Sequence, residues 1–340
     1  MNAPVAELTI KDFASDQEVR WCPGCGDYAI LKTVQKTLPE LGVAKENQVF
    51  VSGIGCSSRF PYYMNTYGFH TIHGRAPSFA TGIKLANPDL DVWVITGDGD
   101  GLSIGGNHMV HLLRRNVNLQ LLLFNNEIYG LTKGQYSPTS KVGTSSPSTP
   151  HGSIDMPLKP CSFALGCGAK FVARSIDTEA KHLGPMLKRA HSHKGASFVE
   201  IYQNCPVYND GIFDDIKEKK TAAETRLVLE HGKPLTFGAE QNKGLILNPK
   251  TLALEIVMLG EGGVNVEDLV VHDETNRVLA QLLANLKLPD FPEPIGVIYC
   301  DPSAPDFTGE VYDQRVLVRE SKEKPDLNAL LRTGHTWMVE

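Results

Sequence analysis

An acid and an amide that each follow an apolar run are the residues of this sequence best suited to chemistry. Gly97-Asp98-Gly99 comes directly after Val92 to Thr96, and Asn125-Asn126 comes directly after Leu119 to Phe124. Two parallel strands joined by a helix end at the same edge of a sheet, where open α/β folds bind ligands. The spacing therefore predicts that Asp98 and Asn126 lie side by side and present two hard oxygen ligands.

Four of the seven cysteines occupy positions in the sequence that could bring them together at a single site. Cys22 and Cys25 form a C-x-x-C pair, and Cys56 and Cys205 each lie in a loop after a predicted strand. Because loops at the carboxyl edge of a sheet face one crevice, the four thiols could converge near Asp98. Four thiolates suit a zinc ion or an iron–sulfur cluster, but structural zinc usually draws its ligands from two close pairs. One pair with two distant cysteines favours a [4Fe–4S] cluster.

The cysteines also allow interpretations other than a cluster. A thioredoxin-like redox pair would explain Cys22 and Cys25 and would leave the two distant cysteines unexplained. The other three cysteines are interpreted as small buried side chains, and these are Cys161, Cys167 and Cys300.

The GDG and NN sequences, separated by residues 100–124, resemble the thiamine diphosphate motif. The resemblance implies that Asp98, Asn126 and the backbone carbonyl of Ile128 hold a Mg²⁺ ion, which in turn binds the diphosphate. Magnesium is usually held in this way, by few protein oxygens together with phosphate oxygens. The alternatives are an ordinary glycine-rich loop and a dinucleotide-binding turn. A dinucleotide turn requires G-x-G-x-x-G and an acidic residue after the next strand, but Gly101 comes one position early and the strand ends in amides.

Composition is that of a globular protein with a mild acidic excess. The chain has 340 residues, a hydrophobic fraction of 41% and a net charge of −6, which gives no reason to expect nucleic acid as a partner. The first residues lack the pattern of a signal or transit peptide, and no apolar run reaches the length of a membrane span. We therefore expect no membrane association and a cytoplasmic location.

Hydrophobic periodicity predicts alternating strands and helices over the first two-thirds of the chain. This alternation is typical of an α/β fold with a doubly wound, mostly parallel sheet and helices on both faces. The expected strands are 47–53, 92–96, 119–124, 170–173 and 196–202, and the expected helices are 27–41, 76–86, 102–115, 161–168 and 178–190.

Two stretches of the sequence stand outside this alternation. Residues 137–160 are dense in Ser, Thr, Pro and Gly and predict a long loop. This loop would cover the cofactor or a partner, or else be a disordered surface excursion. Residues 214–226 form a charged helix or linker. We expect a first domain over 1–230 and a C-terminal extension over 231–340, with a helix at 266–286, a strand at 295–299 and a role in subunit contact.

Six sequence motifs together resemble the β subunit of 2-oxoacid:ferredoxin oxidoreductases, in particular the 2-oxoglutarate type. They run in the family's order and read WCPGCG, SGIGCSS, HGRA, GDGDG, FNNEIYGLTKGQ and QNCPVYN. The resemblance implies the diphosphate-binding half of a thiamine diphosphate fold and one [4Fe–4S] cluster held by Cys22, Cys25, Cys56 and Cys205. It also implies a larger α (or fused γ–α) subunit that supplies the pyrimidine half and the activating glutamate. A dimer of heterodimers and ferredoxin as electron acceptor are expected.

The implied reaction is the oxidative decarboxylation of 2-oxoglutarate to succinyl-CoA and carbon dioxide, with coenzyme A as co-substrate and a possible reverse direction. Because the electrons leave one at a time, an iron–sulfur centre beside the thiamine site is the chemical requirement. The alternatives are pyruvate or another 2-oxoacid as substrate, a thiamine enzyme without a redox centre, and an electron-transfer or structural subunit with a vestigial thiamine motif.

The resemblance also suggests roles for residues around the cofactor. Positions expected near the cofactor are Gly55, Cys56, Ser57 and His73, and positions expected to line the diphosphate are Gly99, Asp100, Leu131 and Thr132. Lys133 is the candidate contact for the far carboxylate of 2-oxoglutarate. His73 and Lys133 are thus the predicted catalytic residues. The alternatives are a structural histidine beside a turn and a solvent-facing lysine.

Overall fold

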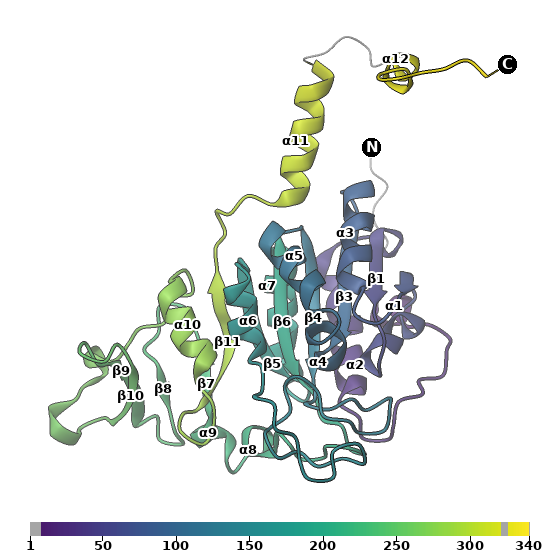
Figure 1. Ribbon diagram of the computed structural model, residues 1–340. Helices are drawn as coiled ribbons and strands as arrows, with labels where there is room; N and C mark the ends of the chain where they lie inside the picture. Colours follow the sequence, from purple (N-terminus) through teal and green to yellow (C-terminus); the bar gives the residue numbers. More distant parts are fainter. Residues whose placement is uncertain (1–7, 321–325, 340) are drawn as a thin grey trace.

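The computed structural model describes residues 8–320 and 326–339, and an eight-stranded sheet forms its centre (Figure 1). The strand order is β2-β1-β3-β4-β6-β5-β11-β7. All neighbours are parallel except β11 and β5, which are antiparallel. The strands are β1 (Gln48–Ser52), β2 (Tyr67–His70), β3 (Asp91–Gly97), β4 (Leu119–Asn125), β5 (Phe171–Ile176), β6 (Ala196–Tyr202), β7 (Arg226–Leu229) and β11 (Glu293–Cys300). The predicted doubly wound, mostly parallel sheet is confirmed.

Helices cover both faces of the sheet because successive side chains of its strands point in opposite directions. Val92 and Val94 of β3 pack in one core cluster, and Trp93 and Ile95 pack in the other. The first cluster includes residues of α3 (Ala76–Ala86), α5 (Gly106–Arg115), α6 (Pro160–Gly166) and α10 (Arg277–Asn285). The second includes residues of α2 (Asp27–Thr37) and α7 (Ala180–Ser192). Strands buried on both faces explain the near-continuous apolar runs in the sequence.

The local predictions agree with most of these elements. The strand at 196–202 and the helix at 76–86 match β6 and α3 residue for residue. The helix expected from residue 102 begins at Gly106, because a short helix α4 (Asp98–Leu102) ends at Ser103, whose ψ of −107° is not helical. Residues 137–159 contain no helix or strand, as predicted, and α6 begins at Pro160. The sequence analysis missed the edge strand β2, which has only four residues, all of them exposed.

The chain beyond β7 differs more from the sequence prediction. The helix predicted over 266–286 is wrong in its first half, because only Arg277–Asn285 is α-helical and the Asn276 side chain caps its start. A separate antiparallel sheet of β8 (Thr236–Phe237), β9 (Lys243–Leu247) and β10 (Leu254–Met258) lies beside the main body in Figure 1. The expected division at residue 230 stays a prediction, and β11 from beyond it joins the main sheet.

Short helices and the chain ends complete the described structure. α1 (Ile10–Phe13), α8 (Asp214–Lys217) and α9 (Ala222–Thr225) each have four residues. α11 (Phe307–Glu320) and α12 (Leu327–Leu331) project from the end of the body opposite the long loops (Figure 1). Across the described ranges, no helix combines the length and apolar character needed to cross a membrane.

Candidate active site

Four neighbouring parallel strands bring the predicted site residues to one edge of the sheet. The strands β1, β3, β4 and β6 are adjacent in that order, and the residues after them include Cys56, Asp98, Asn126 and Cys205. Because the strands are parallel, these residues all follow carboxyl ends, which face the long loops at the bottom of Figure 1.

A first cavity at this edge, called here the cofactor cavity, is lined by the predicted diphosphate and magnesium residues. Those among its lining residues are Gly55, Cys56, Ser57, His73, Asp98, Gly99, Asp100, Asn126, Ile128, Leu131 and Thr132. Tyr129, which the sequence did not single out, also lines it and donates from its hydroxyl to the Gly99 carbonyl at 2.9 Å. A Cβ at Gly99 would lie 2.3 Å from the Tyr129 ring, so only glycine fits at this position.

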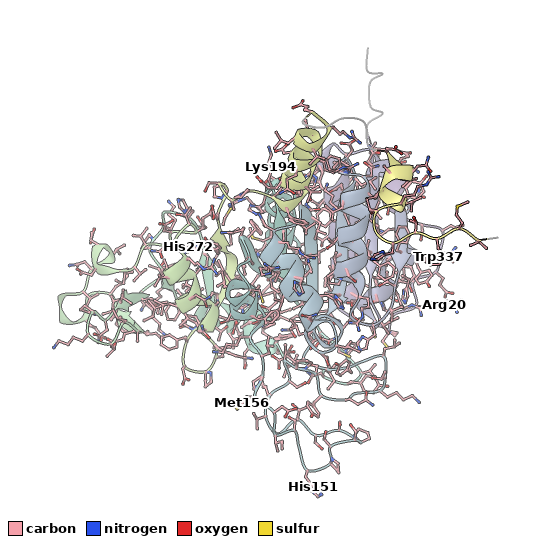
Figure 2. All side chains as sticks on the ribbon, turned by 45° about the horizontal axis from the view of Figure 1, so that its top comes forward. Arg20, His151, Met156, Lys194, His272 and Trp337 are labelled. Carbon is pink, nitrogen blue, oxygen red and sulfur yellow. The ribbon has the colours of Figure 1, made fainter. Side chains whose placement is uncertain are left out.

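The Asp98 carboxylate is buried and held by the long loop. Its Oδ2 accepts hydrogen bonds from Ser137 Oγ at 2.5 Å and Thr139 Oγ1 at 2.7 Å. Burial removes the Asp98 carboxylate from water and raises its pKa, although the hydrogen bonds from Ser137 and Thr139 act in the opposite direction. Among the described residues, no basic side chain forms an ion pair with Asp98. The start of the 137–160 loop thus contacts the site, while the labelled His151 lies at the outer end of the loop (Figure 2).

The two asparagines after β4 have different surroundings. Asn125 points into the core, where its Nδ2 donates to Glu200 Oε1 at 2.8 Å. Asn126 lines the cofactor cavity, and its Nδ2 donates to Gln203 Oε1 at 2.7 Å. Its Oδ1 accepts from the Ile128 backbone N–H at 3.2 Å. The amide of Asn126 is therefore oriented by two fixed partners.

The Asp100 side chain accepts hydrogen bonds from neighbouring segments of the chain at the cofactor cavity. Its Oδ1 accepts from the backbone N–H groups of Ile54 and Gly74, at 3.0 and 2.7 Å, and from His73 Nδ1 at 2.7 Å. Its Oδ2 accepts from the Thr96 hydroxyl at 2.6 Å. Because these bonds occupy both oxygens, the carboxylate of Asp100 acts as an internal support, whereas Asp98 has fewer partners.

A second cavity, called here the cluster cavity, is lined by all four predicted cluster cysteines, Cys22, Cys25, Cys56 and Cys205. Four residues line both cavities, namely Cys56, Asn126, Gly130 and Leu131, so the two cavities are neighbours. A Cβ placed on Gly130 would lie 3.4 Å from Cys205 Sγ and 3.6 Å from Cys56 Sγ. Gly130, in the loop that follows the NN motif, therefore lies beside both Cys56 and Cys205. Among the described residues, no three His, Cys, Asp or Glu side chains group as ligands of a single ion.

Burial makes free thiolates unfavourable in the cluster cavity. It raises the pKa of Cys56 to about 12, and the nearby Asp27 carboxylate and the other thiols add to the effect. Burial raises the pKa of Cys25 further still. Negative thiolates in these positions would need a positive group between them.

Several expectations about single residues have a plain structural outcome. Lys133 is exposed, does not line either cavity, and has a left-handed backbone with φ of 79°. Cys161 and Cys300 are buried as predicted, whereas Cys167 is only partly buried. Sequence reasoning missed Ser137, Thr139 and Gln203 as partners of the site, because nothing in their local sequence indicates which side chains they meet.

Residues 53–201, which include all the lining residues of the cofactor cavity, match the family model "Thiamine pyrophosphate enzyme, C-terminal TPP binding domain", so this part of the chain is a domain of that class. The chain belongs to the family of 2-oxoacid:ferredoxin oxidoreductase β subunits. It is 50% identical over 335 residues to the 2-oxoglutarate oxidoreductase subunit KorB of Mycobacterium tuberculosis, covering 97% of this chain and 88% of that relative.

Two further comparisons support the family. The chain is 48% identical over 192 residues to a 2-oxoacid:ferredoxin oxidoreductase β subunit of Saccharolobus solfataricus, a match of 56% of this chain and 63% of that relative. It superposes with a TM-score of 0.77 and 33% identity on a chain of the 2-oxoglutarate:ferredoxin oxidoreductase from Magnetococcus marinus, solved with 2-oxoglutarate, coenzyme A and succinyl-CoA bound, covering 98% of both chains. The family resemblance predicted from the motifs is confirmed.

Proposed function

We propose that this chain is the β subunit of a 2-oxoglutarate:ferredoxin oxidoreductase. The complex would convert 2-oxoglutarate and coenzyme A to succinyl-CoA and carbon dioxide, and electrons would pass through a [4Fe–4S] cluster to ferredoxin. The observation that carries this proposal is the shared wall of the two cavities, where Cys56, Asn126, Gly130 and Leu131 line both. When bound, thiamine diphosphate would supply the electron sink for decarboxylation and the cluster a one-electron acceptor.

Asp98, Asn126 and the Ile128 carbonyl would hold Mg²⁺ and, through it, the diphosphate. The fit rests on the donor set, which consists of oxygens of the kind that magnesium prefers. Asp98 is a buried acid without a basic partner among the described residues, so a cation would relieve the cost of its burial. Gly99, Leu131 and Thr132 line the same cavity, and their N–H groups would donate to phosphate oxygens.

Cys22, Cys25, Cys56 and Cys205 would hold the [4Fe–4S] cluster. Thiols that border a cavity suit a cluster, which occupies a volume, better than a single ion. Gly130 supports this assignment, because a longer side chain would enter the space between Cys56 and Cys205.

His73 and Lys133 would act on the substrate. Asp100 fixes the His73 ring through Nδ1, which leaves Nε2 to give or take a proton in the cofactor cavity, beside Gly55 and Ser57. Lys133 lies directly after the cavity residues Leu131 and Thr132, and we propose that its ammonium meets the far carboxylate of 2-oxoglutarate once the partner subunit covers the site.

The partner is proposed to be a larger α (or fused γ–α) subunit that supplies the pyrimidine half of the site, in a cytoplasmic dimer of heterodimers. The support is that residues 53–201 match the C-terminal, TPP-binding domain of thiamine pyrophosphate enzymes and that a relative is named a β subunit. This chain would therefore be inactive until the partner covers its cofactor cavity.

Purification of the two-subunit complex without oxygen tests the proposal. Broad absorption near about 400 nm with about four irons per β chain is expected for the cluster. A colourless complex that contains zinc would refute it. Turnover with 2-oxoglutarate, pyruvate and branched 2-oxoacids, assayed with coenzyme A and a viologen dye, then decides the substrate, and faster turnover of pyruvate would favour the alternative.

A further inference from the structure

The Gln203 side chain contacts both halves of the proposed redox site. It is 1% exposed and follows β6, two residues before Cys205. Its Nε2 donates to Cys25 Sγ at 3.3 Å, and its Oε1 accepts from Asn126 Nδ2 at 2.7 Å. The second hydrogen of Nε2 goes to the Asn204 carbonyl. The Gln203 backbone N–H donates to the Asn125 carbonyl at 2.9 Å, which fixes the residue against β4.

These contacts fix the direction of both amides. The two donors of Gln203 Nε2 have a thiol sulfur and a carbonyl as acceptors, so Oε1 must face Asn126. Asn126 must then turn its Nδ2 toward Gln203 and its Oδ1 the other way, where Oδ1 also accepts from Ile128 N. With the opposite orientation, Asn126 would offer hydrogens to a cation in place of an oxygen. Outer partners of metal ligands commonly act in this way.

The same side chain gives Cys25 a hydrogen-bond donor in a buried setting. Hydrogen bonds to cluster sulfurs are among the groups that set reduction potentials, because they stabilise the more negative reduced state. Within the cysteine set, Cys56 has a different support, since the Trp21 ring N–H donates to its backbone carbonyl at 2.7 Å.

We propose that Gln203 is a positioning residue that links the two cofactors. It would orient the Asn126 oxygen toward magnesium and, through the same amide, raise the reduction potential of the cluster at Cys25. This inference rests on the proposed function, because it needs magnesium at Asn126 and a cluster at Cys25. A substitution of Gln203 should therefore change both the reduction potential of the cluster and the affinity for thiamine diphosphate with Mg²⁺.

Gln203→Met in the anaerobically purified complex is the test, because methionine has a similar length and no amide. We expect the potential of the cluster, measured by EPR-monitored redox titration, to become more negative. We also expect the affinity for thiamine diphosphate with Mg²⁺, measured by calorimetry on the cofactor-stripped complex, to fall about 10–100-fold. Gln48→Met is the matched control, since Gln48 lies at the amino end of β1, is also fully buried, and within the described part of the chain donates from its side chain to the Val43 carbonyl alone. The control should keep both values.

An unchanged potential in a Gln203→Met complex that retains its iron would overturn the proposal, as would unchanged thiamine diphosphate affinity. Should the variant fail to assemble, the wild-type complex prepared with ¹⁵N-labelled glutamine side chains allows a direct measurement. ENDOR of the reduced cluster should detect one coupled glutamine nitrogen, and the absence of coupling would refute the contact. A wild-type complex without iron would instead refute the proposed function itself, so the two failures are distinguishable.

Discussion

Asp98 and Asp100 stand two residues apart in one motif, and the structure predicts opposite effects when each is replaced by asparagine. Three donors meet Asp100 Oδ1, and these are Ile54 N, Gly74 N and His73 Nδ1. A hydrogen bond to a charged group contributes about 1.5–3 kcal/mol and one to a neutral group about 0.5–1.5 kcal/mol, so each bond weakens by about 1 kcal/mol in Asp100→Asn. The Thr96 hydroxyl can turn to accept from the new amide. The expected loss is therefore about 3 kcal/mol.

Asp98→Asn should cost the cofactor-free complex little stability. Burial raises the pKa of Asp98, which means that its charge is unfavourable in the folded chain without a cation. Asparagine removes this charge and keeps an acceptor for Ser137 and Thr139. Magnesium loses its anionic ligand, however, so binding of thiamine diphosphate should weaken by more than the about 10–100-fold typical of an outer partner.

The assay measures both variants in the cofactor-stripped complex. Thermal unfolding followed by tryptophan fluorescence should show a lower Tm for Asp100→Asn, by about 6 °C at about 2 °C per kcal/mol for a chain of this length. The Tm of Asp98→Asn should lie at or above that of the wild type. Calorimetry with thiamine diphosphate and Mg²⁺ should show the larger loss of affinity for Asp98→Asn. Equal Tm losses in the two variants would refute the assignment of one carboxylate to support and the other to metal binding.

Three further outcomes are expected. Lys133→Met should reduce kcat/KM for 2-oxoglutarate about 10–100-fold and change that for pyruvate less, because one charged contact is lost; an equal loss on both substrates would exclude the role. Gly130→Leu should abolish iron binding by filling the space between Cys56 and Cys205, whereas Gly130→Ala, with its Cβ in ordinary contact with both sulfurs, should retain it; iron analysis of the two variants separates these results. Burial raises the pKa of the Asp27 carboxyl from its ordinary value of 3.8 to about 7. The folded, cluster-free chain therefore holds a proton on Asp27 more tightly than the unfolded chain does. Its stability in urea should fall as pH rises between these two values, and Asp27→Asn should remove that slope, which an unchanged slope would contradict.

The sequence by itself determined the central strands of the sheet and the chemical types of the side chains at the site. Strands buried on both faces need continuous apolar residues, so the runs before Gly97 and Asn125 identified β3 and β4 directly. Because parallel strands end at one edge, the positions of Asp98, Asn126 and Cys205 along the chain were enough to predict that they share a crevice.

Tertiary structure alone decided elements without a strong local pattern. The edge strand β2 has only four residues, all of them exposed, so its local pattern is too short to identify it. Residues 266–276 contain apolar positions that suggested a helix, although the α-helix begins only at Arg277. The sequence predicted that Lys133 contacts the substrate, but the side chain does not line the cofactor cavity of this chain. The proposed contact therefore needs the partner subunit to cover the site.

The direction of each polar group at the site was also decided by tertiary structure. The sequence Asn125-Asn126 does not indicate which side-chain amide enters the core and which faces the cofactor cavity. That choice depends on Glu200 and Gln203, which β6 brings beside β4 from a distant part of the chain. Periodicity is a local property and can be read from neighbours in sequence, whereas a hydrogen bond between distant residues exists only after the sheet has fixed which strands are adjacent. For the same reason, Asp98 and Asp100 look equivalent in the motif and have different partners in the folded chain.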